Sequence, residues 1–244
     1  MTALRHRLFH AGPLPAHAEV RLDADASHHA VRVLRLRPGA TVELFDGAGT
    51  RAPATLVDAE PGGATVRVGA LCVAGTEAPV RLSLAQAIPS GDRMDWIVEK
   101  AVELGVAEVQ PLVSQRTLLR LDAARMQRRV EHWRRIVVAA CMQCGRDRLP
   151  AVHEPLPLTR WLGAADAVER RLLTPRGEPM AALGPAPSTG LWLLAGPEGG
   201  FTDDEERAAR AAGCRPWRLG PRTLRAETAA LAALAALQAC GGDF

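Results

Sequence analysis

No stretch of the sequence is long and apolar enough to span a bilayer, so we expect no membrane partner. The first residues, MTALRHRLFH, lack the apolar core of a secretory signal, and we therefore expect a cytoplasmic protein. Cysteine is also scarce: the five cysteines are an odd number, which argues against a disulfide framework. Cys141 and Cys144 form a C-x-x-C pair without a second pair. We therefore expect no metal site and interpret both as buried packing residues.

Lysine is almost absent, because Lys100 is the one lysine among 30 basic residues. This bias is typical of a GC-rich genome. The net charge of +3 is small, but residues 116–148 hold nine arginines against three acidic residues. Such a local excess favours a nucleic-acid-binding surface. A solvated helix face is the alternative interpretation, although such faces usually mix the two signs more evenly.

The first third of the 244 residues is rich in short strand patterns. TVELF at 41–45 alternates apolar and polar residues and meets an Asp46-Gly47 turn, which is a strong hairpin signal. Another strand pattern follows the Gly62-Gly63 turn. Several short strands with close turns predict a small β-barrel, and residues 75–79 (GTEAP) predict a linker behind it.

From Val80 onward, strand patterns alternate with helix patterns. The expected strands are 80–88, 106–113, 170–175, 190–196 and 217–220, and the expected helices are 92–104, 122–144 and 226–240. GLWLLAG at 190–196 is apolar throughout, as is typical of a strand that is buried on both faces of a parallel sheet. The alternation predicts an α/β domain with a mostly parallel sheet.

A glycine-rich loop, GPEGG at 196–200, follows the most apolar of these strands and precedes an acidic helix start. Thr202 and Glu205 fit a capping box, so the helix should begin at Thr202. Ligands of open α/β sheets bind past the carboxyl ends of the strands, which is where this loop lies. Glu198 would repel a phosphate, so a neutral or cationic nucleoside-like ligand fits better. A plain connecting loop is the alternative.

A second loop, LGPRTLRAETAA at 219–230, again runs from a short strand into a helix. It carries Arg222, Arg225, Glu227 and Thr228 within seven residues. Charged groups at this density indicate a binding or catalytic role, while a helix start with a surface ion pair is the alternative.

These two loops, together with ELGV at 103–106 and QCGRDRLP at 143–150, closely resemble the bacterial 16S ribosomal RNA uridine N3-methyltransferases of the SPOUT superfamily. RLFH and VLRLRPGATVELFDG resemble the PUA-like RNA-binding domain of the same family. The resemblance implies a PUA-like β-barrel over residues 1–75 and a SPOUT domain with a C-terminal trefoil knot over residues 80–244. It also implies a homodimer and S-adenosylmethionine as the cofactor.

The resemblance implies that three knot loops hold the cofactor. The expected cofactor-binding residues are Leu173, Thr174, Pro175, Ala195, Gly196, Pro197, Glu198, Gly199, Gly200, Leu219, Gly220, Pro221, Leu224 and Arg225. The family often has His-Pro-Arg where this chain has Thr174-Pro175-Arg176, so no role of the histidine carries over.

Methylation of uridine N3 requires loss of the N3 proton, and the resulting negative charge spreads onto O2 and O4. An arginine near these oxygens would stabilise the anion, with Arg225 as the first candidate and Arg222 as the second. Glu227 or Glu198 could accept the proton, although each carboxylate could instead have a structural role.

The RNA substrate, 16S ribosomal RNA or the small ribosomal subunit, should contact arginines of both domains. The candidates for phosphate contacts are Arg5, Arg7, Arg32, Arg35, Arg125, Arg128, Arg129 and Arg135.

Three rival functions remain. A SPOUT ribose 2′-O-methyltransferase of tRNA or rRNA would use the same knot. A non-catalytic RNA-binding ribosome-assembly factor would have decayed cofactor loops, whereas these loops are intact. A nicotinamide-dependent oxidoreductase would require G-x-G-x-x-G, which does not occur here.

Overall fold

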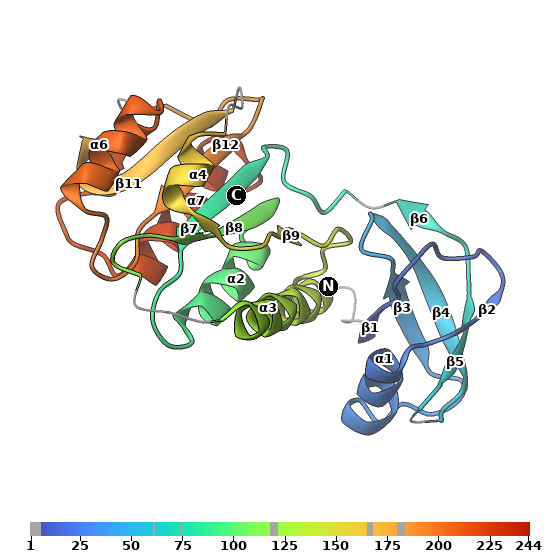
Figure 1. Ribbon diagram of the computed structural model, residues 1–244. Coiled ribbons are helices and arrows are strands. Elements are labelled where there is room, and N and C mark those ends of the chain that lie inside the picture. Colours follow the sequence, from blue (N-terminus) through green and yellow to red (C-terminus); the bar gives the residue numbers. More distant parts are fainter. Residues whose placement is uncertain (1–5, 61, 74, 118–121, 165–167, 180–183) are drawn as a thin grey trace. The chain divides into compact units, whose positions relative to one another are not determined.

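The computed structural model describes residues 6–60, 62–73, 75–117, 122–164, 168–179 and 184–244 (Figure 1). The chain forms two compact units. The first comprises Met1–Glu77 and Cys141–Leu149, and the second comprises Ala78–Ala140 and Pro150–Phe244. None of the described helices is long and apolar enough to cross a membrane.

The first unit contains a largely antiparallel sheet with the strand order β1-β3-β4-β5-β2, in which β6 also pairs with β4. Its strands are β1 (His6–Phe9), β2 (Glu19–Arg21), β3 (Thr41–Phe45), β4 (Thr50–Asp58), β5 (Thr65–Val68) and β6 (Cys72–Val73). β1 pairs in parallel with β3, and the other described pairs are antiparallel. The predicted hairpin is present, because the Asp46 carboxylate accepts hydrogen bonds from the amides of Ala48 and Thr50 at 2.8 and 2.9 Å and closes the β3–β4 turn.

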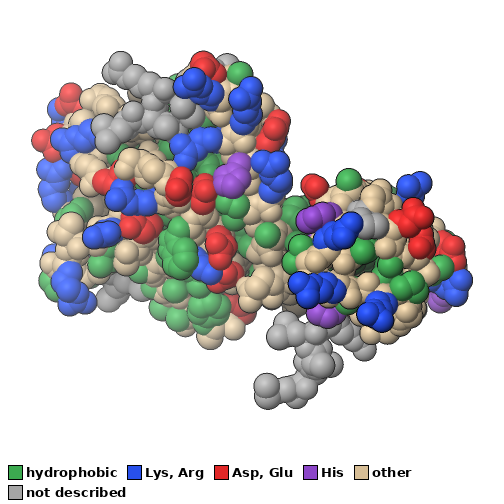
Figure 2. All heavy atoms as spheres, turned by 90° about the horizontal axis from the view of Figure 1, so that it is seen from below, with side chains coloured by type: hydrophobic (Ala, Val, Ile, Leu, Met, Phe, Trp, Pro, Cys, Tyr) green, Lys and Arg blue, Asp and Glu red, His purple; other side chains and the backbone are tan. Residues whose placement is uncertain are grey.

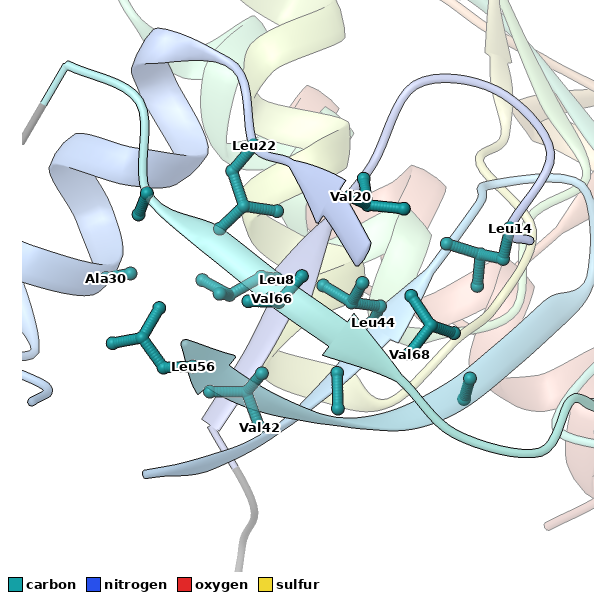
Figure 3. Close-up of a cluster of buried hydrophobic side chains, with 13 residues drawn as sticks. Leu8, Leu14, Val20, Leu22, Ala30, Val42, Leu44, Leu56, Val66 and Val68 are labelled. Atoms are coloured by element: carbon teal, nitrogen blue, oxygen red, sulfur yellow. The ribbon is translucent and has the colours of Figure 1, made fainter. Parts of the chain in front are cut away.

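Apolar side chains from β1, β3, β4 and β5 meet on one side of this sheet, beside the short helix α1 (Ala24–His28) and the π-helical turn η1 (His29–Val33) (Figure 3). The buried core residues are Leu8, Leu14, Val20, Leu22, Ala30, Val42, Leu44, Ala52, Ala54, Leu56, Ala64, Val66 and Val68. The buried Ser27 keeps its hydroxyl bonded, since it donates to the Leu22 carbonyl and accepts from the Ala64 amide.

The last turn of α3 (Ala123–Cys144) and the loop that follows it belong to this first unit. The Leu149 amide donates to the Gly47 carbonyl, and the Asp147 carboxylate, which is only 1% exposed, binds the Arg7 guanidinium. Arg7 also pairs with Glu43 at 3.1 Å, and its own side chain is only 8% exposed. The expectation that Arg7 contacts RNA is therefore wrong for this arrangement, because its charge is neutralised inside the unit.

The second unit contains a sheet with the strand order β10-β8-β7-β12-β11-β13, in which β9 also pairs with β8. All of its described strand pairs are parallel, as predicted. Its strands are β7 (Leu82–Ala87), β8 (Glu108–Val113), β9 (Ala151–Val152), β10 (Leu156–Pro157), β11 (Glu169–Pro179), β12 (Leu191–Ala195) and β13 (Arg215–Arg218).

Helices cover both faces of this sheet. α2 (Arg93–Glu103) packs against α7 (Ala226–Gly241), which also contacts β7 and β12, whereas α4 (Leu158–Leu162) packs near α6 (Asp203–Ala211). All six residues of β7 are buried, as expected for a central strand. The helix predicted from 122 to 144 is α3, and the Asp122 carboxylate accepts from the Arg125 amide at its start.

Both cysteines of the C-x-x-C pair lie at the end of α3. Cys141 is buried, as expected for a packing residue, whereas Cys144 is only half-buried. Burial raises the pKa of the Cys141 thiol to about 12, which makes it a poor nucleophile.

Candidate active site

A cavity of about 470 Å³ lies at the carboxyl ends of β12 and β13 and beside a bulge within β11. It is lined by Leu173, Thr174, Pro175, Arg176, Ala195, Gly196, Pro197, Glu198, Gly199, Gly200, Phe201, Glu206, Trp217, Arg218, Leu219, Gly220, Arg222, Thr223, Leu224, Ala226 and Ala229. The three loops that the sequence analysis selected therefore meet around one cavity, at the edge of the sheet where open α/β folds bind ligands.

The first wall is a bulge in β11. Leu173 and Glu178 both pair with Trp217 of β13, so residues 174–177 loop out of the ladder, and the first three of them line the cavity. Gly177 permits this close approach, because a Cβ at this position would lie 2.5 Å from the Trp217 backbone nitrogen.

The second wall is the GPEGG loop. The Gly200 amide donates to the Pro197 carbonyl at 2.9 Å, and Gly200 has a φ of +66°, a conformation that favours glycine. The Gln86 side chain donates to the Gly196 carbonyl at 3.1 Å from β7, and the Arg116 guanidinium donates to the Gly199 carbonyl at 2.6 Å. The loop is thus fixed by side chains from two neighbouring segments.

Glu198 anchors the middle of the same loop. Its carboxylate accepts from the Ser90 amide at 2.8 Å and from the Ser90 hydroxyl at 2.6 Å, and it also binds the Arg93 guanidinium. Burial raises the pKa of Glu198, but the hydrogen bonds from Ser90 and Arg93 outweigh it, so the pKa lies below its ordinary value of 4.5. These contacts support the structural alternative for this carboxylate.

The predicted capping box starts α6 behind this loop. The Thr202 hydroxyl accepts from the Glu205 amide at 3.2 Å, and the Glu205 carboxylate accepts from the Thr202 amide at 2.9 Å. Glu205 also accepts from the Gln115 amide at 2.8 Å, which ties the helix start to the segment after β8.

An acidic side chain that the sequence analysis did not select, Glu206, lines the cavity beside the β11 bulge. It accepts a hydrogen bond from the Thr174 hydroxyl at 3.0 Å and pairs with Arg176 at 3.2 Å. Arg176 also donates to Asp203 at 2.7 Å, and this contact lowers the pKa of Asp203. Thr174 therefore holds a carboxylate in the cavity wall.

The third wall is formed by residues 217–224 and the start of α7. Arg222 is exposed and lines the cavity. Among the described residues, Pro221, Arg225 and Glu227 do not line it. Arg225 is the N-cap residue of α7, with its side chain exposed. Glu227 lies with its Oε1 3.9 Å from the Arg93 Nε.

The structure thus places most of the predicted cofactor residues together and changes the order of the catalytic candidates. Arg222 is at the cavity, and Arg225 is outside its lining in the described chain. Sequence reasoning missed the residues behind the walls, Gln86, Ser90, Arg93 and Arg116. Ser90 and Arg93 directly follow β7, so the rule on the carboxyl ends of strands could have indicated them.

Of the arginines expected to bind RNA, Arg5 lies outside the described residues. Arg32, Arg35, Arg128 and Arg135 are exposed. The remaining three have partners: Arg7 pairs with Asp147 and Glu43, Arg125 pairs with Asp122, and Arg129 donates to the Gly91 carbonyl and lies over the Trp133 ring. On the face seen in Figure 2, basic side chains are interspersed with acidic ones.

Known proteins match both parts of the chain. Residues 76–238 match the RNA methyltransferase domain family, and residues 22–69 match the RNA methyltransferase PUA domain family. The ribosomal RNA small subunit methyltransferase E of Synechocystis is 35% identical over 97% of this chain and 78% of its own length. The chain belongs to the ribosomal RNA small subunit methyltransferase E family.

Two solved structures resemble this member of the family over almost its whole length. A ribosomal RNA small subunit methyltransferase E from Neisseria gonorrhoeae, bound to S-adenosylmethionine, is 34% identical over 98% of this chain and 99% of that chain, with a TM-score of 0.92. A methyltransferase from Legionella pneumophila, in complex with the same cofactor, is 33% identical over the same shares, with a TM-score of 0.93. The predicted PUA-like domain and SPOUT-like parallel α/β domain are confirmed.

Proposed function

We propose that this chain transfers the methyl group of S-adenosylmethionine to N3 of a uridine in 16S ribosomal RNA, and that it does so in the cytoplasm. The observation that carries the proposal is the cavity formed by three strand-end loops, with Glu198 and Glu206 in its wall. Its family membership and the cofactor bound to two similar structures support the same assignment. The choice of N3 rests on the resemblance of the GPEGG and LGPRTLRAETAA loops.

The size of the cavity suits this cofactor. A cavity of about 470 Å³ is within the ordinary range for small-molecule sites. The described lining carries two carboxylates, Glu198 and Glu206, each paired with an arginine, and three arginines, Arg176, Arg218 and Arg222, so its charge alone does not select between a sulfonium and a pyrophosphate. Among the described residues, no cluster of three potential metal ligands occurs.

The reaction breaks the bond between sulfur and methyl and forms a bond between methyl and N3, while the N3 proton leaves. The sulfur keeps the electron pair, and the product is S-adenosylhomocysteine. Arg222 is proposed to stabilise the negative charge on the uracil oxygens, because it lines the cavity and is exposed. Arg93 holds Glu198 and faces Glu227, so water is proposed as the proton acceptor instead of either carboxylate.

RNA binding is proposed for the exposed arginines of the first unit and α3, chiefly Arg32, Arg35, Arg128 and Arg135. Such phosphate contacts position the substrate and do not select its sequence. The homodimer and the trefoil knot implied by the resemblance stay predictions. Sedimentation equilibrium of the purified chain tests the first of them.

Calorimetry with S-adenosylhomocysteine and mapping of modified uridines in 16S ribosomal RNA test the function together. Cells that lack the gene should lose one N3-methyluridine and regain it with the intact gene. Absence of cofactor uptake by folded protein would refute the proposal, and a methyl group found on ribose would support the 2′-O rival.

Variants at the two arginine candidates refine the assignment. R222A should lower turnover about a hundredfold, which is typical for loss of one group that stabilises an oxyanion, while the affinity for S-adenosylhomocysteine changes less than about threefold. R225A serves as the matched comparison from the same loop. A larger loss of turnover in R225A than in R222A would return Arg225 to first place.

A further inference from the structure

Arg93, the first residue of α2, lies between the GPEGG loop and the start of α7. Its Nη1 binds Glu198 Oε1 and donates to the Ser90 hydroxyl at 3.1 Å, and its Nε lies 3.9 Å from Glu227 Oε1. The side chain of Arg93 is 40% exposed, whereas that of Glu227 is 16% exposed. One guanidinium therefore faces Glu198, which lines the cavity, and Glu227, which lies behind its third wall at the start of α7.

Glu227 depends strongly on this contact. Its Oε2 is buried and has no hydrogen-bond partner in the described part of the chain, and Arg93 is its one described ion-pair partner. An enclosed carboxylate is costly unless a positive charge lies near it. Loss of Arg93 would leave Glu227 uncompensated and would loosen the start of α7.

The GPEGG loop is also held by contacts that do not involve Arg93. Glu198 already accepts two hydrogen bonds from Ser90, and Arg116 fixes the same loop through the Gly199 carbonyl. Neither Ser90 nor Arg116 has a described contact with α7. Arg93 is the residue that adds a link between the GPEGG loop and α7, which packs against α2.

We propose that Arg93 is a positioning residue that couples the two cofactor loops by pairing with Glu198 of one and Glu227 beside the other. In this role it sets the separation between residues 196–200 and residues 219–225, and hence the width of the cavity. The inference rests on the proposed function, because it takes the cavity to be the S-adenosylmethionine site. It also assigns Glu227 a role through Arg93 in place of proton transfer.

The test compares R93M with R116M. Both variants remove an arginine that contacts the GPEGG loop, but R93M alone removes the link to α7. R93M should raise the KM for S-adenosylmethionine and the Kd for S-adenosylhomocysteine about tenfold, while kcat changes less than about threefold. Hydrogen exchange at the amides of 219–230 should speed up in R93M and stay unchanged in R116M. E227Q should reproduce the faster exchange at 219–230 without changing it at 196–200.

Unchanged exchange at 219–230 in R93M, or an equal increase in R116M, would overturn the coupling. R93K keeps the positive charge and should restore most of the lost affinity, so an R93K variant as weak as R93M would overturn it as well. These outcomes are separate from failure of the proposed function. If the wild-type chain takes up no S-adenosylhomocysteine, the function fails, whereas the exchange comparison still reports on the link.

Discussion

The two loops that meet at the cavity from opposite sides of β11 differ sharply in how they are held. Residues 196–202 receive hydrogen bonds or ion pairs from Gln86, Ser90, Arg93 and Arg116, and the loop ends in a capping box. In the described structure, the side chains of 219–225 make no hydrogen bond, and most of them are exposed. One wall of the cavity is therefore rigidly anchored, while the other is tethered chiefly through its neighbour Glu227.

This difference suggests that the two walls of the cavity have different functions. A pre-formed wall binds a ligand without an ordering cost, whereas a loosely held wall can adapt when a second substrate arrives. The anchored GPEGG loop suits the cofactor, which must bind in one geometry. The exposed loop with Arg222 suits the arrival of RNA.

The larger of the two loops' expected effects on cofactor affinity comes from release of the anchored wall. E198Q removes the charge that binds Arg93 and weakens the bonds from Ser90, so the affinity for S-adenosylhomocysteine should fall about tenfold, or ~1.4 kcal/mol. Calorimetry measures this loss.

The matched control for E198Q is D204N, which removes an exposed carboxylate that pairs with Arg207 within α6. Exposed pairs of this kind contribute little, so D204N should bind as the wild type does. Equal affinities of E198Q and the wild type would show that the GPEGG loop does not need this anchor.

A smaller effect is expected when a single methyl group is added to a glycine in each of the two loops. Gly200 and Gly220 have φ angles of +66° and +94°, and a Cβ at either position would meet nothing within 4 Å. G200A should lower the free energy of unfolding by about 1 kcal/mol, because the anchored loop cannot relax its backbone. G220A should cost clearly less, since its loop can adjust. Thermal unfolding of the two variants decides, and equal losses would contradict the contrast.

The smallest expected effect is a pH dependence confined to the anchored loop. Because the pKa of folded Glu198 lies below its ordinary value of 4.5, its contribution to stability is present above about pH 4.5. The contribution is lost as the pH falls through the lowered pKa. The difference in Tm between wild type and E198Q should therefore stay constant from about pH 7 to 5 and shrink below 4.5. A difference that shrinks between pH 7 and 5 would contradict the assignment.

Much of this site could be predicted from the sequence because its signals are local. The capping box at Thr202 and Glu205, the apolar strand before it and the glycine loop are contiguous in the chain, and each has a specific physical signature. The cavity then follows from the rule on strand ends.

The features of the site and the fold that the sequence analysis did not predict depend on contacts between residues distant in sequence. Arg93 and Glu198 are 105 residues apart, and Arg7 and Asp147 are 140 apart. Arg7 was expected to contact RNA because an arginine in a basic segment has the same pattern whether its charge is exposed or neutralised. Its burial follows from a carboxylate supplied by the end of α3, which no local pattern reveals.

The bulge in β11 has a consequence for which residues of this fold can be substituted. Since the strand leaves and rejoins its neighbour opposite a single residue, Trp217, residues 174–176 can vary in composition while the ladder on both sides keeps its alignment. Position 177 needs glycine, because a Cβ there would meet the Trp217 backbone. Selection can thus retune the lining of the pocket at residues 174–176 without rebuilding the sheet that supports it.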